Sequence, residues 1–395
     1  MTTADLPVLQ SDRSVVGRLS PLMRDLRARG PVVKVRTLAG DEAWLVTRHA
    51  ELKQLLQDDR LGHSHPDPAN RPRYLDNPML DMAVSNADPA TARENHLRTR
   101  AALTPYLSAK RMSGLRSRIA ERVEGLLDAV VVEQPPVDLH AMLSLPLSFQ
   151  VLCDLLGVSD HEKFMSMLTD AGRVDDSAEA ASGARILFDH LATLAAEKRA
   201  HPEDDLISAL CELGISDEAV SALVAGTSLS YLVTPTNLSA GIALFAANPD
   251  QRDKVIQQPE LVPAAVEEVL RMGKVGESCM PRYASADIEI GEIVIRAGEL
   301  VLCDHNAAGF DDRVFGEPER FDVTRSPNPH LAFSHGISHC VGAPLARVEL
   351  QEAIAGLLQR LPSLRLAVPI EEIPLVAEEG SDQLGGGIAR LPVTW

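Results

Sequence analysis

The chain has 395 residues, of which 45% are hydrophobic and 24% charged, which is ordinary for a soluble globular protein. Its formal net charge of −18 argues against a nucleic-acid partner. No uninterrupted apolar run reaches the length of about 18 residues that a membrane span needs. The N-terminus has no basic region followed by an apolar run, so we expect neither an export signal nor a membrane anchor. Five scattered cysteines, an odd number, indicate a reducing, cytoplasmic location.

The first quarter of the chain predicts a small region of mixed structure. Residues 1–13 are expected to be a poorly ordered tail, and the apolar spacing of residues 14–29 predicts an amphipathic helix. Alternating apolar side chains at 33–35 and 44–46 predict two strands of a small sheet. Residues 61–93 are rich in Pro, Asp, Asn and His without a sustained period, which predicts a long loop.

The middle of the chain predicts a helix-rich body. Four segments have helical apolar periodicity and end at glycine or proline. They are residues 109–132, 141–156, 160–172 and 181–199. Residues 217–247 are apolar nearly all round, as in a buried helix, and contain Pro235. Since proline lacks an N–H, we expect a kink that frees the carbonyl of Tyr231.

Residues 333–347, FSHGISHCVGAPLAR, have the clearest chemistry of the chain. Cys340 lies between Gly336 and Gly342, and Pro344 then opens a run of good helix formers, which predicts a loop entering a helix N-terminus. Free amide groups and the positive end of the helix dipole would then face the sulfur and favour thiolate. A thiolate held in this way suits a soft metal or a haem iron.

Three other interpretations of Cys340 stay open from the local pattern alone. It could be a packing residue, as most single cysteines are. It could bind zinc together with His335 and His339, although no paired ligand spacing accompanies them. It could be a Cys/His nucleophile, which would need a distant base that the sequence does not single out.

This segment closely resembles the haem-binding loop of bacterial cytochrome P450 enzymes. The matching residues are Phe333, Gly336, Cys340 and Gly342. Ser334 stands where a glycine is usual, and Ser338 where the family has a propionate-binding His or Arg. The second difference removes a cation near the haem carboxylates, so another group must offset that charge.

Further motifs follow in the order and spacing of that family. His96 and Arg100 share one helix face, which by itself predicts only a solvated surface. The resemblance implies that they bind haem propionates. The haem contacts implied in this way are His96, Arg100, Arg282, Phe333, Gly342 and Ala346, with Cys340 on the iron.

A pair of opposite charges, Glu268 and Arg271, lies three residues apart on a predicted helix. As a surface pair it would contribute less than about 1 kcal/mol. The resemblance implies instead that both are buried with the arginine of the later EPERFD motif, Arg320, and that this cluster positions the haem loop.

The helix that the resemblance places over the haem departs from the family pattern Ala-Gly-x-Asp/Glu-Thr. Ala225-Gly226 looks like its start, whereas counting back from residues 248–251 places the groove at Tyr231–Pro235. Neither alignment supplies a carboxylate. We therefore expect the kink, with Thr234 or Thr236, to provide the oxygen groove, and a plain helix distortion is the alternative.

Together these features predict a mainly α cytochrome P450 fold with small β-sheets, one domain over residues 1–395, and one haem b. The implied reaction is monooxygenation of a small organic substrate, hydroxylation or epoxidation in bacterial secondary metabolism. Electrons would come from ferredoxin and a reductase, and the substrate could be free or bound to a carrier protein. The implied pocket residues are Tyr231, Leu232, Met280, Ile388 and Ala389.

Partner docking and two alternative functions complete the expectations. A basic patch for the electron donor is expected at Arg98, Lys110, Arg111, Arg116 and Arg118. The missing carboxylate favours, as one alternative, a haem-thiolate enzyme with peroxide-driven, coupling, rearrangement or dehydration chemistry. The other alternative is a haem-binding protein without catalysis.

Overall fold

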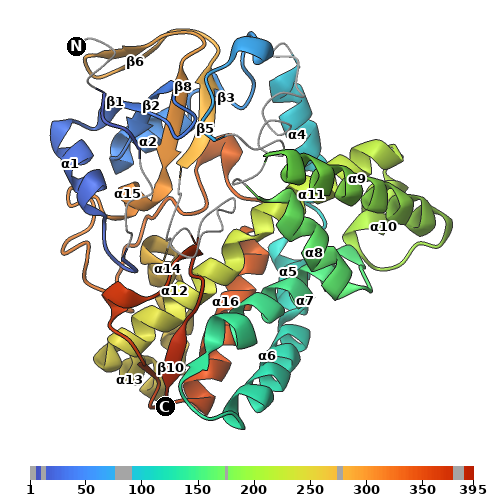
Figure 1. The fold of residues 1–395 in the computed structure, drawn as a ribbon, viewed down its shortest axis with the longest axis vertical. Coiled ribbons are helices and arrows are strands. Elements are labelled where there is room, and N and C mark those ends of the chain that lie inside the picture. The colour runs from blue at the N-terminus through green and yellow to red at the C-terminus, as the bar shows by residue number, and fades with distance from the viewer. Residues whose placement is uncertain (1–5, 10–14, 76–90, 174–176, 274–278, 377–386) are drawn as a thin grey trace.

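The computed structural model describes residues 6–9, 15–75, 91–173, 177–273, 279–376 and 387–395. Helices form most of the molecule, and a sheet region lies at one end, where the N-terminal segment and residues 279–304 come together (Figure 1). The helices are α1 (Pro21–Arg29), α2 (His49–Leu56), α4 (Ala92–Leu103), α5 (Ala109–Gly114), α6 (Arg116–Val131), α7 (Leu145–Leu156), α8 (His161–Ala171), α9 (Ser177–Ala200), α10 (Leu206–Glu212), α11 (Asp217–Tyr231), α12 (Val233–Ala247), α13 (Pro249–Gln257), α14 (Val262–Met272), α15 (His305–Gly309) and α16 (Ala343–Arg360). The mainly α prediction is confirmed.

The largest sheet has five strands in the order β1-β2-β8-β5-β3. They are β1 (Val32–Arg36), β2 (Glu42–Val46), β3 (Leu61–Gly62), β5 (Cys279–Ala284) and β8 (Leu300–Asp304). Only β2 and β8 pair in parallel within this sheet. Side chains of β8 alternate between two hydrophobic clusters, because Leu300 and Leu302 face one cluster while Val301 and Cys303 face the other. The sheet is therefore covered on both faces.

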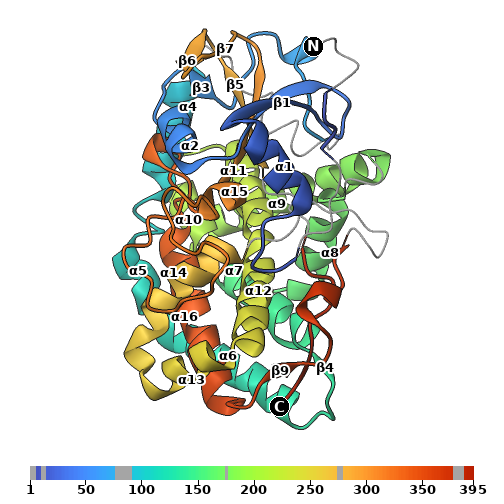
Figure 2. The same ribbon diagram turned by 90° about the vertical axis from the view of Figure 1, so that its left-hand side faces the viewer.

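Two small sheets complete the strand pairing. One joins β4 (Val137–Asp138), β10 (Pro392–Thr394) and β9 (Arg365–Leu366), which ties the C-terminus to the helical body. The other is the antiparallel hairpin of β6 (Ile288–Ile290) and β7 (Ile293–Ile295). Figure 2 shows the hairpin and the C-terminal sheet at opposite ends of the molecule.

The helix pair α11–α12 runs through the centre of the molecule in both views (Figures 1 and 2). Residues 217–247 are long and apolar enough to cross a membrane, but 67% of their most apolar window is buried against the rest of the chain. They are thus a core helix. The helix is interrupted at Leu232, and Pro235 lies in the first turn of α12, where a proline is tolerated. Leu232 itself keeps helical dihedral angles, with φ −58° and ψ −20°, so the kink that frees the Tyr231 carbonyl stays a prediction.

Two predicted boundaries in the N-terminal part are wrong. The first helix begins at Pro21 rather than at residue 14, because Ser20 caps it by accepting a hydrogen bond from the N–H of Met23 at 3.2 Å. Within the expected tail, the N–H of Leu9 donates to the carbonyl of Arg36 at 2.8 Å, so residues 6–9 lie against β1. Residues 1–5, 10–14 and 76–90, the last within the predicted long loop, are outside the described residues.

Candidate functional site

The cysteine of the motif lies where a loop enters α16. The N–H of Cys340 donates to the carbonyl of Phe333 at 2.8 Å, which closes the loop. The N–H groups of Gly342 and Ala343, at the start of α16, are directed at the sulfur. A Cβ on Gly342 would lie 3.7 Å from that sulfur, so the glycine leaves room beside it. The predicted loop-to-helix geometry is confirmed.

The ionisation of this thiol differs from the expectation. Burial raises the pKa of Cys340, and the amides of Gly342 and Ala343 and the charges of Arg100 and Arg347 oppose this rise without cancelling it. The protein groups alone therefore do not favour the thiolate form of Cys340. A raised pKa also disfavours the Cys/His nucleophile, which needs a lowered one.

The path of the loop requires two residues with positive φ. Gly336 has φ 63°, and its hypothetical Cβ would approach the carbonyl of Leu56 to 3.0 Å. Ser334, at the position where the family usually has glycine, has φ 61°. Its buried hydroxyl has no hydrogen-bond partner among the described residues. Ser334 therefore adopts a left-handed backbone conformation that glycine adopts easily, and the serine side chain makes this conformation strained.

A buried carboxylate, Glu268 on α14, holds the chain that precedes the cysteine loop. Its two oxygens accept bonds of 2.7 and 2.8 Å from Arg271, and both side chains are fully buried. Asn328 donates to the same carboxylate at 3.0 Å. Arg271 also donates at 2.7 Å to the carbonyls of Gly309 and Pro318. The charge is thus matched by donors from several segments, as a buried charge requires.

The third member of this cluster is Arg325, and the prediction of Arg320 is wrong. Arg325 donates to Glu268 at 3.0 Å, and its side chain is 12% exposed. The Arg320 side chain is 58% exposed and pairs with Glu317 at 2.9 Å. Only the backbone carbonyl of Arg320 faces the cluster, where it accepts a hydrogen bond from Arg325.

A second acidic group, Glu267, connects α14 to the cysteine loop and to α16. It pairs with Arg347 at 2.7 Å and with His330 at 3.1 Å. Burial by itself would raise the pKa of Glu267. The hydrogen bonds from His330 and Arg347 outweigh this effect and lower the pKa of Glu267 to about 2. Arg347 also lies over the ring of Phe333, 4.6 Å from its centroid. The sequence analysis missed this connection, although Arg347 lies within the quoted motif.

The residues predicted to bind haem propionates lie beside the same loop. His96 is 3.1 Å from the carbonyl of Ile337, and Arg100 donates to the carbonyl of His339 at 2.5 Å. Arg282, on β5, is buried, and among the described residues its guanidinium bonds only the carbonyl of Pro281. Burial lowers the pKa of Arg282, and no carboxylate contributes to its environment. These basic groups have no acidic partner among the described residues.

A haem fits this arrangement of donors. Cys340 is accessible from one side although protein surrounds its sulfur elsewhere, unlike the fully buried Cys153 and Cys303. It is therefore not a packing residue. The nearby basic groups without acids match the two carboxylates of a haem. Among the described residues no three His, Cys, Asp or Glu side chains gather to hold a metal ion, so the zinc interpretation has no support.

The residues predicted for the oxygen groove lie at the start of α12. Thr234 and Thr236 are both buried. A Cβ on Gly387 would come within 2.6 Å of the Thr236 hydroxyl, so the C-terminal turn packs directly on this helix. The helix interruption at Leu232 falls within the second of the two registers considered above. The predicted pocket residues differ in exposure. Ile388 is buried in the main core and Met280 is exposed. Tyr231, Leu232 and Ala389 are partly buried.

A buried polar network that the sequence analysis missed joins this interruption to α16. The hydroxyl of Tyr231 donates to Glu349, which also accepts a bond of 2.6 Å from Ser148 on α7. Glu349 is completely buried. Burial raises its pKa to about 7, although the bonds from Ser148 and Tyr231 act in the opposite direction. Burial also raises the pKa of Tyr231, with the charge of Glu349 adding to the rise.

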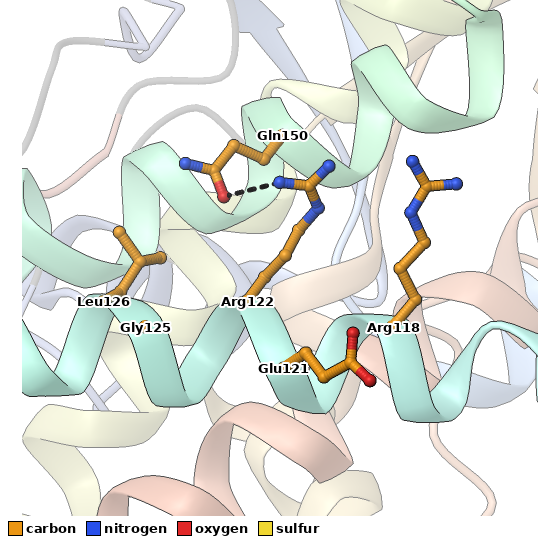
Figure 3. A pocket seen from close by; sticks show the side chains of 6 residues that line it. All are labelled: Arg118, Glu121, Arg122, Gly125, Leu126 and Gln150. Atoms are coloured by element: carbon orange, nitrogen blue, oxygen red, sulfur yellow. Dashed lines mark hydrogen bonds between the residues drawn. The ribbon is translucent and has the colours of Figure 1, made fainter.

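A hollow on the surface of α6 and α7 lies apart from the cysteine loop (Figure 3). It is lined by Arg118, Glu121, Arg122, Gly125, Leu126 and Gln150. Arg122 donates to Gln150 at 3.3 Å, as drawn, and to Asp154 at 2.6 Å. None of the residues predicted to bind haem or substrate lines this hollow.

Comparisons with known proteins identify the family of this chain. A family model described as Cytochrome P450 matches residues 246–372. Pentalenolactone synthase of Streptomyces exfoliatus is 37% identical over 401 residues, which cover 99% of this chain and 100% of that protein. Mycinamicin IV hydroxylase/epoxidase of Micromonospora griseorubida is 37% identical over 393 residues and 94% of each chain. The substrate-free structure of PimD, a pimaricin epoxidase, has a TM-score of 0.89 and 42% identity, covering 99% of this chain and 100% of its own.

The chain belongs to the cytochrome P450 family. It is a monooxygenase of bacterial secondary metabolism that uses haem b, and the family implies a small-molecule substrate and redox partners.

The two arginines near Glu268 provide a matched pair of substitutions. Arg325→Ala leaves a buried carboxylate short of a partner and should lower the free energy of unfolding by about 3 kcal/mol or more. Arg320→Ala removes only an exposed pair and should change it by less than about 0.5 kcal/mol. Urea-induced unfolding of both variants checks this, and equal effects would contradict the assignment of Arg325.

The raised pKa of Glu349 predicts a pH-dependent stability. The pKa of Glu349 is about 7 in the folded protein, against an ordinary 4.5. The stability that goes with its protonated form is therefore fully present below about pH 4.5, and it is lost as the pH rises to about 7. Between about pH 5 and pH 8, wild type should lose roughly 2 to 3 kcal/mol of unfolding free energy relative to Glu349→Gln. Urea unfolding at both pH values measures this difference. The exposed Glu133→Gln is the control, and parallel pH profiles for wild type and Glu349→Gln would refute the expectation.

Proposed function

We propose that Cys340 would bind the haem iron and that the enzyme oxidises a bacterial natural product. The observation that carries this is the accessible sulfur beneath two amides, next to basic groups that lack acidic partners among the described residues. Hydroxylation or epoxidation of a polyketide or peptide product, free or attached to a carrier protein, is the substrate chemistry that we infer from the relatives.

The haem, when bound, supplies the oxygen-activating chemistry, and the chain positions it. In this proposal the amides of Gly342 and Ala343 hold the charge of the Cys340 sulfur by hydrogen bonding. His96, Arg100 and Arg282 hold the propionates, and Phe333, Gly342 and Ala346 contact the ring. Glu268, Arg271 and Arg325 keep the preceding segment in place.

The oxygen side of the pocket lacks the family's acid–alcohol pair, since Leu232 and Val233 stand there in the second register. We infer that the helix interruption before Pro235 takes over its role. A proline without an N–H leaves the Tyr231 carbonyl free of its usual partner in the helix. This carbonyl and the hydroxyls of Thr234 or Thr236 can then hold water and pass a proton toward the pocket.

The substrate pocket is proposed to be mainly aliphatic. Only 4% of the residues of the chain are aromatic. The proposed contacts are Tyr231, Leu232, Met280, Ile388 and Ala389. Since Ile388 is buried in the main core, next in sequence to the Gly387 that packs on Thr236, it would shape the pocket wall rather than bind substrate polar groups.

Ferredoxin and a ferredoxin reductase are the proposed electron donors in a cytoplasmic setting. The basic patch expected for docking is largely neutralised, because Arg111, Arg116 and Arg118 pair with Asp204, Glu352 and Asp154. Within the described part of the chain, Arg98 and Lys110 remain without such pairing. They leave a smaller positive surface beside α4 and α5 for an acidic partner.

A second candidate function rests on the missing carboxylate. A haem-thiolate enzyme that uses peroxide, or that couples or rearranges its substrate, has less need of the acid–alcohol pair. Oxygen-isotope labelling separates the two functions, because monooxygenation places one atom of oxygen gas in the product.

The first test of function is turnover with ferredoxin, reductase, NAD(P)H and labelled oxygen gas. Label is expected in the product from wild type, and the reduced enzyme should show a thiolate-type carbon monoxide spectrum. Cys340→Ala should lose both that spectrum and the activity. Unlabelled product with peroxide-supported turnover would favour the second function. Retention of the thiolate-type spectrum by Cys340→Ala would exclude Cys340 as the ligand.

The second test concerns the helix interruption. Pro235→Ala restores the N–H and should close the helix over the Tyr231 carbonyl. We expect less product per NAD(P)H and more peroxide, with substrate binding retained. Oxygen uptake, peroxide and product measured together report this coupling.

The control for this substitution is Pro249→Ala, at the start of α13. Its proline also occupies the first turn of a helix, but α13 is outside the proposed pocket, so coupling should stay as in wild type. Unchanged coupling in Pro235→Ala would exclude the proposed groove.

A further inference from the structure

A histidine that is outside the family motifs lies directly beside Arg282. The short strand β3 pairs with β5 in antiparallel register, with Leu61 opposite Ala284 and Gly62 opposite Tyr283. Continuing this register by one residue places His63 opposite Arg282. Strand pairing therefore brings an imidazole to the buried guanidinium.

A second basic group packs on the same imidazole. The rings of His63 and His96 are stacked, with centroids 6.1 Å apart and planes inclined by 29°. His63 thus lies between His96 of α4 and Arg282 of β5. The pKa of His63 is lowered well below its ordinary 6.5 by the charge of Arg282, by burial and by His96. Every one of these influences opposes a proton on His63, and no carboxylate of the described residues acts on it.

The next histidine of the loop shows what a satisfied structural histidine looks like here. His65 contacts Asp67 through one ring nitrogen, and its other nitrogen lies 3.0 Å from the carbonyl of Gly298. Its ring also packs edge-on against Tyr283. No described residue forms a hydrogen bond with His63. The ring nitrogens of His65 thus have hydrogen-bond partners, as in a structural histidine, whereas those of His63 have none among the described residues and are available to a ligand.

The guanidinium of Arg282 is a buried charge without an acidic partner among the described residues, and an anion beside it would supply the missing counterion. A haem at Cys340 brings two carboxylates to this side of the site. The residue that relatives use for one of them is replaced by Ser338, which carries no charge.

We propose that His63 binds a haem propionate together with Arg282 and supplies the contact that Ser338 lacks. Its imidazole N–H donates to a propionate oxygen, and the stacked His96 fixes the plane of the ring. His63 is a cofactor-positioning residue in this assignment. The inference depends on the proposed haem site at Cys340.

The test is haem retention in purified holoenzyme. The variants are His63→Leu, His63→Arg and the double variant His63→Leu with Ser338→His. The exposed His201→Leu, in the turn after α9, is the matched control. Haem loss is followed as transfer to excess apomyoglobin, and the ferric–ferrous midpoint potential is measured on the same samples.

His63→Leu should lose haem about ten-fold or more faster than wild type, as expected for a lost charge-assisted hydrogen bond. Its midpoint potential should fall, because a donor that offsets negative charge near the iron is gone. His63→Arg and the double variant should lose haem at a rate close to that of wild type, and His201→Leu should match wild type in both measurements.

Two results would overturn the role of His63. One is haem loss and potential of His63→Leu equal to wild type. The other is fast haem loss that neither His63→Arg nor Ser338→His restores, since His63 would then act only by packing. If His63→Leu does not accumulate as holoenzyme, His63→Arg decides alone, because the proposal requires it to hold haem as wild type does. Wild-type protein without a thiolate-type carbon monoxide spectrum would instead remove the haem site itself.

Discussion

The buried carboxylate of Glu268 is the constraint on which the rest of the site depends. A fully buried charge is strongly unfavourable unless every oxygen finds a donor, and here the donors come from α14 itself and from the segment after α15. That segment leads directly into the cysteine loop. The ion cluster around Glu268 thus holds the segment that precedes Cys340, and the residues of this cluster are not among the proposed haem contacts. The adjacent Glu267 accepts a hydrogen bond from Arg347, which ties α14 to α16 on the other side of the cysteine loop.

The distribution of charge explains how an acidic chain prepares a site for an acidic cofactor. The chain has a net charge of −18, and many of its described arginines pair with carboxylates. His63 and His96 lie beside the buried Arg282 without an acid among the described residues, while the amides of Gly342 and Ala343 on α16 face the sulfur of Cys340. In the proposed site, Arg282 and the histidines beside it would bind the carboxylates of the haem and Cys340 would bind its iron, so the two attractions would lie on different elements.

Local spacing allowed the cysteine loop, the following helix and the pairing of Glu268 with Arg271 to be predicted, because each depends on residues within a few turns of one another. The choice between Arg320 and Arg325 depended on the path of the chain after the EPERFD motif, which spacing does not determine. Glu349 lies among apolar residues of α16, so no pattern marks its contact with Tyr231, more than a hundred residues earlier. The start of α1 was predictable, since Ser20-Pro21 is a helix-start signal.

The helix interruption at Leu232 precedes a proline, whereas the family pattern has a carboxylate side chain at this part of the helix. A carboxylate that holds a helix open does so only in the right protonation state, whereas a proline removes the N–H permanently. In the proposed groove, the missing N–H of Pro235 would therefore act independently of pH. The turn at Gly387 seals its far side, because a Cβ there would collide with the Thr236 hydroxyl. If the proposed groove depends on the backbone in this way, the side chains at the usual acid–alcohol positions can be apolar, as Leu232 and Val233 are, and can contact an apolar substrate.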